Sequence, residues 1–244
     1  MATEFGMVID GSGSTKGAAD PQNTMTKWQL EGQIAKALIK ANEDRKETLG
    51  SIDTQESDEI TPNGTSMGGM LTVVFSDEGT LVGAGHMLSV YPDLQDEIDE
   101  TTGKRITRQE IAEDHAGDLN IHNFDQLWRT VRPDGLTYIM EGINIQMEHY
   151  EEEFGEEKHK PTLCLYVQTD GALDDPQDFA DFLRSNDNVV ISCVVVGYGP
   201  DAQRAYRQWN TISQQHKNVH VFATNGSTDV PSIVNQLMAV VAEY

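Results

Sequence analysis

The 244-residue sequence has only two cysteines, no long hydrophobic run and few basic side chains. Cys164 and Cys193 each lie in an apolar, strand-like run, so we expect buried thiols in a reducing, cytoplasmic location rather than a disulfide framework. No stretch approaches the roughly 18 apolar residues of a membrane span. Residues 1–6 have no basic start, so no signal peptide is predicted. These features predict a soluble protein.

Basic side chains number 17 against 40 acidic ones, which gives a formal net charge of −23. A surface with this charge repels nucleic acid phosphates and anionic lipid headgroups. We therefore expect neither a nucleic acid nor a membrane among the partners. The same charge concentrates cations near the surface, although acidity can also serve solubility alone.

The remaining composition, 38% hydrophobic, fits one large α/β domain spanning residues 1–244. Short β-rich runs alternate with helical patterns, which predicts a doubly wound, mostly parallel six-stranded sheet with helices on both faces. The tight turn at residues 76–79 predicts one antiparallel edge strand. The expected strands are residues 4–9, 70–76, 80–86, 162–168, 189–196 and 219–223. The expected helices are residues 26–42, 123–131, 138–150, 201–214 and 229–243, with one more beginning after Asp175.

Three helix starts have recognisable capping residues. Thr26 and Gln29 have the spacing of a capping box. Asn123 is expected to cap its helix, and Asp175 stands before a proline suited to the first turn. Two polar segments rich in turn formers, residues 43–66 and 89–118, are expected to be surface insertions, the second with a short helix near residues 108–115.

Polar side chains follow two of the predicted strands and precede one helix. Asp10, Ser12 and Ser14 come directly after the first strand, in the run Asp-Gly-Ser-Gly-Ser. Asp170 follows the strand at residues 162–168, and Thr137 stands where a loop enters a helix. Doubly wound sheets bind ligands at the carboxyl ends of their strands, so these loops can meet at one edge. Alone, each residue could be an ordinary turn or cap residue. Together they suit Mg²⁺, which prefers hard oxygen ligands.

This set of residues resembles the von Willebrand factor A (vWA) family and its metal-ion-dependent adhesion site (MIDAS). That site combines an Asp-x-Ser-x-Ser loop with a distant Thr and a distant Asp. The resemblance extends over essentially the whole chain in element order. It departs at Gly11, where the family often has a bulkier residue, and in the long insertion before the second strand.

The resemblance implies that Asp10, Ser12, Ser14, Thr137 and Asp170 bind Mg²⁺, or Mn²⁺ or Ca²⁺. It implies that the two aspartates act largely through bound water and leave one coordination position open. A cation that is incompletely neutralised attracts a carboxylate, so we expect a protein partner that presents an Asp or Glu. The expected function is non-enzymatic, cation-dependent protein binding.

Two alternatives stay open. The chain also resembles the haloacid dehalogenase superfamily of Mg²⁺-dependent phosphatases, with Asp10 as nucleophile and Asp170, Asp174 or Asp175 as metal ligands. That family has a second Asp two residues after the first, where this chain has Ser12. The other alternative is a metal-independent vWA scaffold, similar to the A domains of copines and of proteasomal ubiquitin receptors.

Overall fold

Residues 3–50, 69–99 and 102–242 are described by the computed structural model. They fall into two units, which are described separately below. The first unit comprises the described parts of Met1–Leu38, Val73–Thr80 and Pro133–Tyr244, and the second those of Ile39–Thr72 and Leu81–Arg132. Strands β2 and β3 and helix α1 each cross from one unit to the other.

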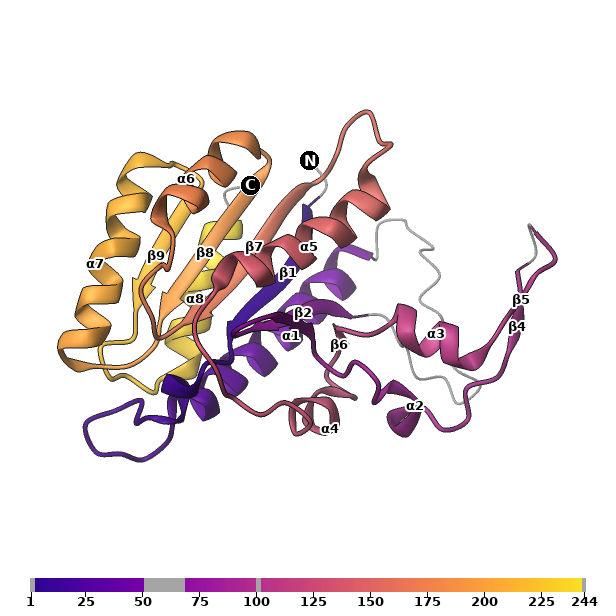
Figure 1. Cartoon of the computed structure of the whole chain (residues 1–244), viewed down its shortest axis with the longest axis horizontal. Helices are drawn as coiled ribbons and strands as arrows, with labels where there is room; N and C mark the ends of the chain where they lie inside the picture. The colour runs from indigo at the N-terminus through magenta and orange to yellow at the C-terminus, as the bar shows by residue number, and fades with distance from the viewer. Residues whose placement is uncertain (1–2, 51–68, 100–101, 243–244) are drawn as a thin grey trace. The chain divides into compact units, whose positions relative to one another are not determined.

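A mostly parallel sheet with the strand order β3-β2-β1-β7-β8-β9 forms the centre of the first unit (Figure 1). Its strands are β1 (Thr3–Asp10), β2 (Met70–Phe75), β3 (Gly79–Leu81), β7 (Thr162–Thr169), β8 (Val189–Val195) and β9 (Val219–Ala223). Strands β1, β7, β8 and β9 pair in parallel, with Ile9 opposite Gln168 in register. The turn from β2 to β3 is closed by a hydrogen bond from Ser76 N to Glu78 O, which reverses the chain at the sheet edge. This arrangement confirms the predicted α/β sheet.

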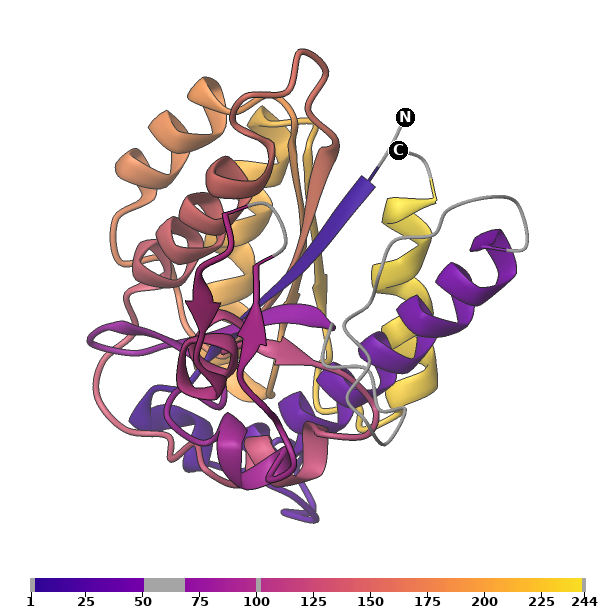
Figure 2. The same ribbon diagram turned by 90° about the vertical axis from the view of Figure 1, so that its right-hand side faces the viewer.

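Helices cover both faces of this sheet, as predicted (Figure 2). Helices α5 (Ile139–Phe154), α6 (Pro176–Ser185) and α7 (Gly199–Gln215) lie on one face. The other face carries α8 (Val230–Val241) and the first part of α1 (Lys27–Gly50). On that face the Tyr166 hydroxyl of β7 lies 3.1 Å from the Met238 sulfur of α8.

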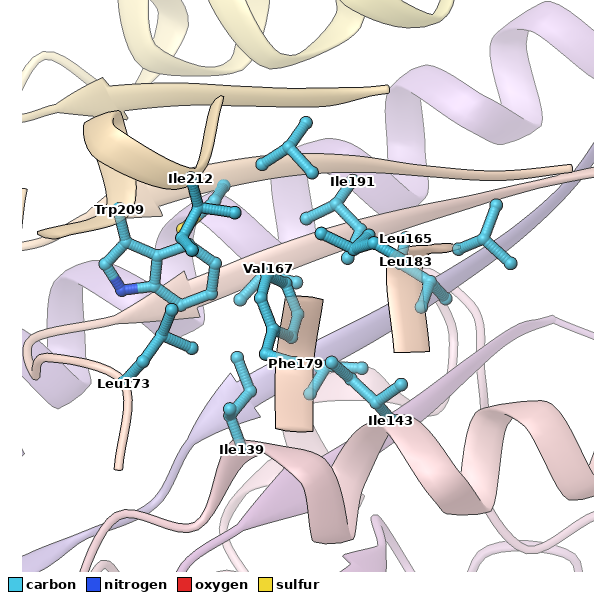
Figure 3. Close-up of a cluster of buried hydrophobic side chains, with 14 of the residues drawn as sticks. Ile139, Ile143, Leu165, Val167, Leu173, Phe179, Leu183, Ile191, Trp209 and Ile212 are labelled. Carbon is cyan, nitrogen blue, oxygen red and sulfur yellow. The ribbon is translucent and has the colours of Figure 1, made fainter. Parts of the chain in front are cut away.

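A hydrophobic core joins the sheet to α5, α6 and α7 (Figure 3). Successive side chains of a strand point to opposite faces, so Leu163, Leu165 and Val167 of β7 all enter this core. Phe179 of α6 packs edge to face on Trp209 of α7, with ring centroids 5.3 Å apart. Fully burying such a side chain contributes roughly 2–3 kcal/mol, so these contacts fix α6 and α7 beside the end of β7.

Two of the three predicted helix caps are confirmed. The Thr26 hydroxyl accepts from Gln29 N at 3.1 Å and the Gln29 amide oxygen accepts from Thr26 N at 2.8 Å, which is a capping box. Asp175 accepts from two backbone amides of α6. The prediction that Asn123 caps its helix was wrong. Asn123 Oδ1 accepts from Asn120 N instead, and α4 (Phe124–Trp128) has no side-chain cap.

The second unit contains short elements that the sequence mostly did not predict. They are α2 (Met87–Val90), α3 (Arg108–Asp114), β6 (Asp118–Leu119) and the antiparallel pair β4 (Glu97–Ile98) and β5 (Arg105–Ile106). Helix α3 was expected, and Thr107 and Glu110 form its capping box. Strand β6 pairs antiparallel with Met70 and Leu71 of β2, so the sheet has seven strands rather than the predicted six. Two-residue strands leave no periodic pattern from which they could be predicted.

Other boundaries also differ from the prediction. Strand β3 ends at Leu81 instead of residue 86, since Gly83 and Gly85 have φ values of 88° and 72° and turn the chain. Residues 43–50 of the first expected insertion continue α1, and residues 51–66 lie outside the described residues. Cys164 and Cys193 are both buried, and neither forms a disulfide with another described residue. Within the described ranges, no helix is long and apolar enough to span a membrane.

Candidate metal centre

The loop after β1 is held in place by the two chain segments beside it. Gly11 N donates to Phe75 O at the end of β2 (2.7 Å), and Asp134 N donates to Gly11 O (2.7 Å). A side chain at Gly11 would overlap the Val74 Cγ1, so the bulkier residue often found here in vWA domains does not fit. The next residues, Gly13–Lys16, form a single 3₁₀ turn, η1. The loop is therefore fixed by backbone contacts before any side chain binds a ligand.

A chain of hydrogen bonds connects four of the five predicted site residues. Asp10, the last residue of β1, accepts from Ser12 N at 2.9 Å. The hydroxyls of Ser12 and Ser14 lie 2.9 Å apart. The Ser14 hydroxyl then donates to Asp170 Oδ1 at 2.7 Å. The loops after β1 and β7 thus meet through their side chains.

The fifth residue, Thr137, reaches the same place from a third loop. Its side chain lies against Gly171, the residue after Asp170, where an added Cβ would be 3.6 Å from Thr137 Oγ1. The loop is positioned by Asp77, whose Oδ1 accepts from Leu136 N at 3.0 Å. Gly135 precedes it with φ 83°, and a Cβ there would lie 2.6 Å from Asp77 Oδ2. Glycine is required at this turn for both reasons.

Sequence reasoning missed two side chains that contact the site directly. Thr169 donates its hydroxyl to Asp10 Oδ2 at 2.8 Å, and Lys27 Nζ lies 2.6 Å from Asp170 Oδ2. A polar residue ending an apolar strand was a usable signal for Thr169. No sequence pattern indicated that Lys27 contacts Asp170. Lys27 stands 143 positions earlier in the chain and is the first residue of a helix.

Burial and mutual repulsion dominate the electrostatics of the carboxyl groups. The pKa of Asp10 is raised to about 6, chiefly by desolvation and then by the charge of Asp170, while the hydrogen bonds from Ser12 and Thr169 offset part of the increase. Glu31 of α1 is also fully buried, and desolvation raises its pKa well above the usual range. The charges of Asp10 and Asp170 raise it further, and Lys27 lowers it. The Lys27 ammonium is thus paired with Asp170, and its charge also acts on Glu31.

The oxygens present fit a small divalent cation. At metal–oxygen distances of about 2.1 Å, neighbouring ligands of an octahedral ion are about 3 Å apart. The Ser12–Ser14 and Ser14–Asp170 separations of 2.9 and 2.7 Å match that spacing. Within the described residues no three carboxylate, imidazole or thiol groups form a metal cluster, so a cation here needs the hydroxyls. Asp10, Ser12, Ser14, Thr137 and Asp170 are the residues that would hold it.

The same geometry is unfavourable for the phosphatase alternative. Asp10 is fully buried, and its two oxygens accept from Ser12 N and the Thr169 hydroxyl. A nucleophilic carboxylate needs an oxygen that can reach phosphorus. Asp175, one of the metal ligands expected for that chemistry, caps α6 with its Oδ1.

Comparison with known proteins gave only weak structural similarities. The chain matches no protein-family model and no curated protein. The manganese-loaded TRAP protein of Plasmodium vivax is 14% identical, with a TM-score of 0.45 over 96% of this chain and 73% of its own. Proximal thread matrix protein 1 from the mussel byssus is 15% identical, with a TM-score of 0.43 over 98% of this chain. Its structure with a zinc-occupied MIDAS motif is 17% identical, with a TM-score of 0.43. This chain spans only 46% of the mussel protein's length, and similarity at these values does not indicate a shared activity.

Proposed function

We propose that this chain is a vWA-like, non-enzymatic domain that binds a protein partner through a divalent cation, Mg²⁺ or Mn²⁺. Asp10, Ser12, Ser14, Thr137 and Asp170 hold the cation, and an Asp or Glu of the partner completes its ligands. The observation that carries the proposal is the hydrogen-bonded series from Ser12 through Ser14 to Asp170 Oδ1. These oxygens come from two loops and already have the mutual spacing of neighbouring metal ligands.

The charge of the site supports an acidic partner. The carboxylates of Asp10 and Asp170 and the ammonium of Lys27 leave one negative charge when Glu31 is protonated. A bound divalent ion reverses that sign and makes the site positive by one charge. A positive site accepts a carboxylate as its last ligand.

Exposed apolar side chains near the site support a protein rather than a small anion as the partner. Leu136 and Tyr138 stand on either side of Thr137 and are 61% and 39% exposed. Tyr198, 41% exposed, follows Gly197, whose added Cβ would lie 3.2 Å from the Lys27 side chain. Aromatic residues are enriched in protein interfaces, whereas recognition of a free anion does not need them.

One observation favours the metal-independent scaffold as a second candidate. The ammonium of Lys27 already neutralises one oxygen of Asp170, whose side chain is only 2% exposed. The site thus has a cationic side chain even without a metal ion. In that case partner binding would not depend on Mg²⁺.

Selection of peptides on the full chain distinguishes these functions. A random peptide library is bound in Mg²⁺ and eluted with a chelator. We expect the eluted peptides to share an Asp or Glu, and their affinity to fall about tenfold or more with Thr137→Ala, which removes one neutral ligand. Thr211→Ala is the matched control, because Thr211 is an exposed threonine of α7.

Two results would contradict the proposal. Peptides that stay bound in chelator and bind Thr137→Ala equally well would favour the metal-independent scaffold. Chelator-eluted peptides without any acidic residue in common would mean that the cation does not accept a partner carboxylate.

A further inference from the structure

Glu31 is a buried acidic residue that the proposed ligand set does not use. It lies in α1 with no exposed surface, between the buried apolar residues Leu30 and Ile34. Within the described part of the chain, neither carboxyl oxygen of Glu31 has a hydrogen-bond partner. Burying a carboxyl group without partners is costly, so its presence calls for a ligand.

Glu31 is close to the candidate metal centre. It follows Lys27 by one helical turn, and the Lys27 ammonium contacts Asp170. The charges of both Asp10 and Asp170 act on the Glu31 carboxyl group. Its two unpartnered oxygens therefore lie near enough to both aspartates for their charges to interact.

Gln168 provides an independent observation in the same region. It is fully buried in β7, two residues before Asp170, and both polar atoms of its amide lack a hydrogen-bond partner. Leu163, Leu165 and Val167 enter the core with α5–α7, so Gln168 points to the opposite face of the sheet. The first part of α1, which includes Glu31, covers that face (Figure 2). Buried polar atoms without protein partners usually bind ordered water.

We propose that Glu31, together with Gln168, is a further part of the cation site and accepts hydrogen bonds from water that the bound cation retains. The inference rests on the proposed function, because it requires the cation. Mg²⁺ and similar ions keep several waters, and those waters need acceptors. Both oxygens of Asp10 already accept hydrogen bonds from the protein. Glu31 adds two acceptor oxygens that the described residues leave unused.

Titration of the full chain with Mn²⁺ alone tests this role, with free Mn²⁺ measured by electron paramagnetic resonance. Glu31→Gln keeps the shape of the side chain and replaces one acceptor oxygen with an amide nitrogen, which can only donate. We expect Mn²⁺ affinity to fall about tenfold or more. In chelator the variant should melt at the same or a higher temperature, since the substitution removes a buried acid without a partner. Glu148→Gln, at an exposed position of α5, controls for overall charge and should bind Mn²⁺ normally.

The outcomes separate this inference from the proposed function. Wild-type binding of Mn²⁺ with equal affinity in Glu31→Gln overturns the role of Glu31 and leaves the proposed function intact. If the wild type does not bind Mn²⁺ at millimolar concentration, both the role of Glu31 and the proposed function are wrong. Glu31→Leu is the second variant, because leucine suits a buried helix face. It should weaken the binding of Mn²⁺ in the same way. If both variants lose Mn²⁺ only together with a lower melting temperature in chelator, the role of Glu31 is structural and the inference is wrong.

Discussion

At the scale of single residues, Lys27 opposes the cation that the other site residues attract. Its ammonium lies 2.6 Å from Asp170 Oδ2, a position from which it repels a divalent ion. We predict that Lys27→Met raises Mn²⁺ affinity severalfold, measured by the same titration of free Mn²⁺. In chelator the variant should lose about 1–3 kcal/mol of stability, because the buried Asp170 oxygen loses its partner.

The prediction is specific because the same substitution should raise Mn²⁺ affinity and lower stability. Lys40→Met, an exposed lysine of the same helix, should change neither quantity appreciably. Weaker Mn²⁺ binding in Lys27→Met would indicate that Lys27 organises the site rather than competing with the cation.

At the scale of elements, Tyr150 connects α5 to the chain segments before β7 and β8. Its hydroxyl donates to Pro161 O at 2.6 Å and accepts from Asn188 Nδ2 at 2.8 Å. Tyr150→Phe should therefore cost about 1–3 kcal/mol at neutral pH. Burial raises the pKa of Tyr150 above its usual value of 10.0, so the contribution of the hydroxyl to stability is complete below pH 10 and is lost as pH rises through the folded-state pKa.

Melting curves of wild type and Tyr150→Phe should consequently converge as the pH is raised above 10. The measurement is the difference in melting temperature between the two proteins across that range. A difference that stays constant up to the highest pH would show that ionisation of the Tyr150 hydroxyl does not change stability. The predicted loss of its contribution with rising pH would then be wrong.

At the scale of the whole molecule, the net charge of −23 acts in opposite directions on the cation and on an acidic partner. Salt screens both interactions. Increasing salt should therefore weaken Mn²⁺ binding, and it should speed the association of an acidic peptide with the Mg²⁺-loaded protein. Association rates from stopped-flow mixing at several salt concentrations measure the second effect. An association rate that falls with salt would mean that the positive site governs the approach more than the acidic surface does.

The long elements and the first loop of the candidate metal centre could be predicted because their signals are local. Strand β8 is an almost unbroken apolar run, and Asp175 followed by proline marks the start of α6. The motif from Asp10 to Ser14 begins at the last residue of β1, so its position at the sheet edge follows from strand direction. The cytoplasmic location and the division of the chain into a single domain with insertions stay predictions.

Sequence alone determined the α/β class and the parallel core strands, which depend on periodicity. It also supplied the five candidate ligands as a prediction, from a short motif and a family resemblance. Tertiary structure decided the two-residue strand β6, the early end of β3, and the neighbours of the site. Lys27 and Glu31 of α1 and Thr169 of β7 gather there because helix packing and strand register bring the two elements together. Contacts between residues far apart in the chain leave no pattern in a single sequence, because either residue alone is compatible with many other environments.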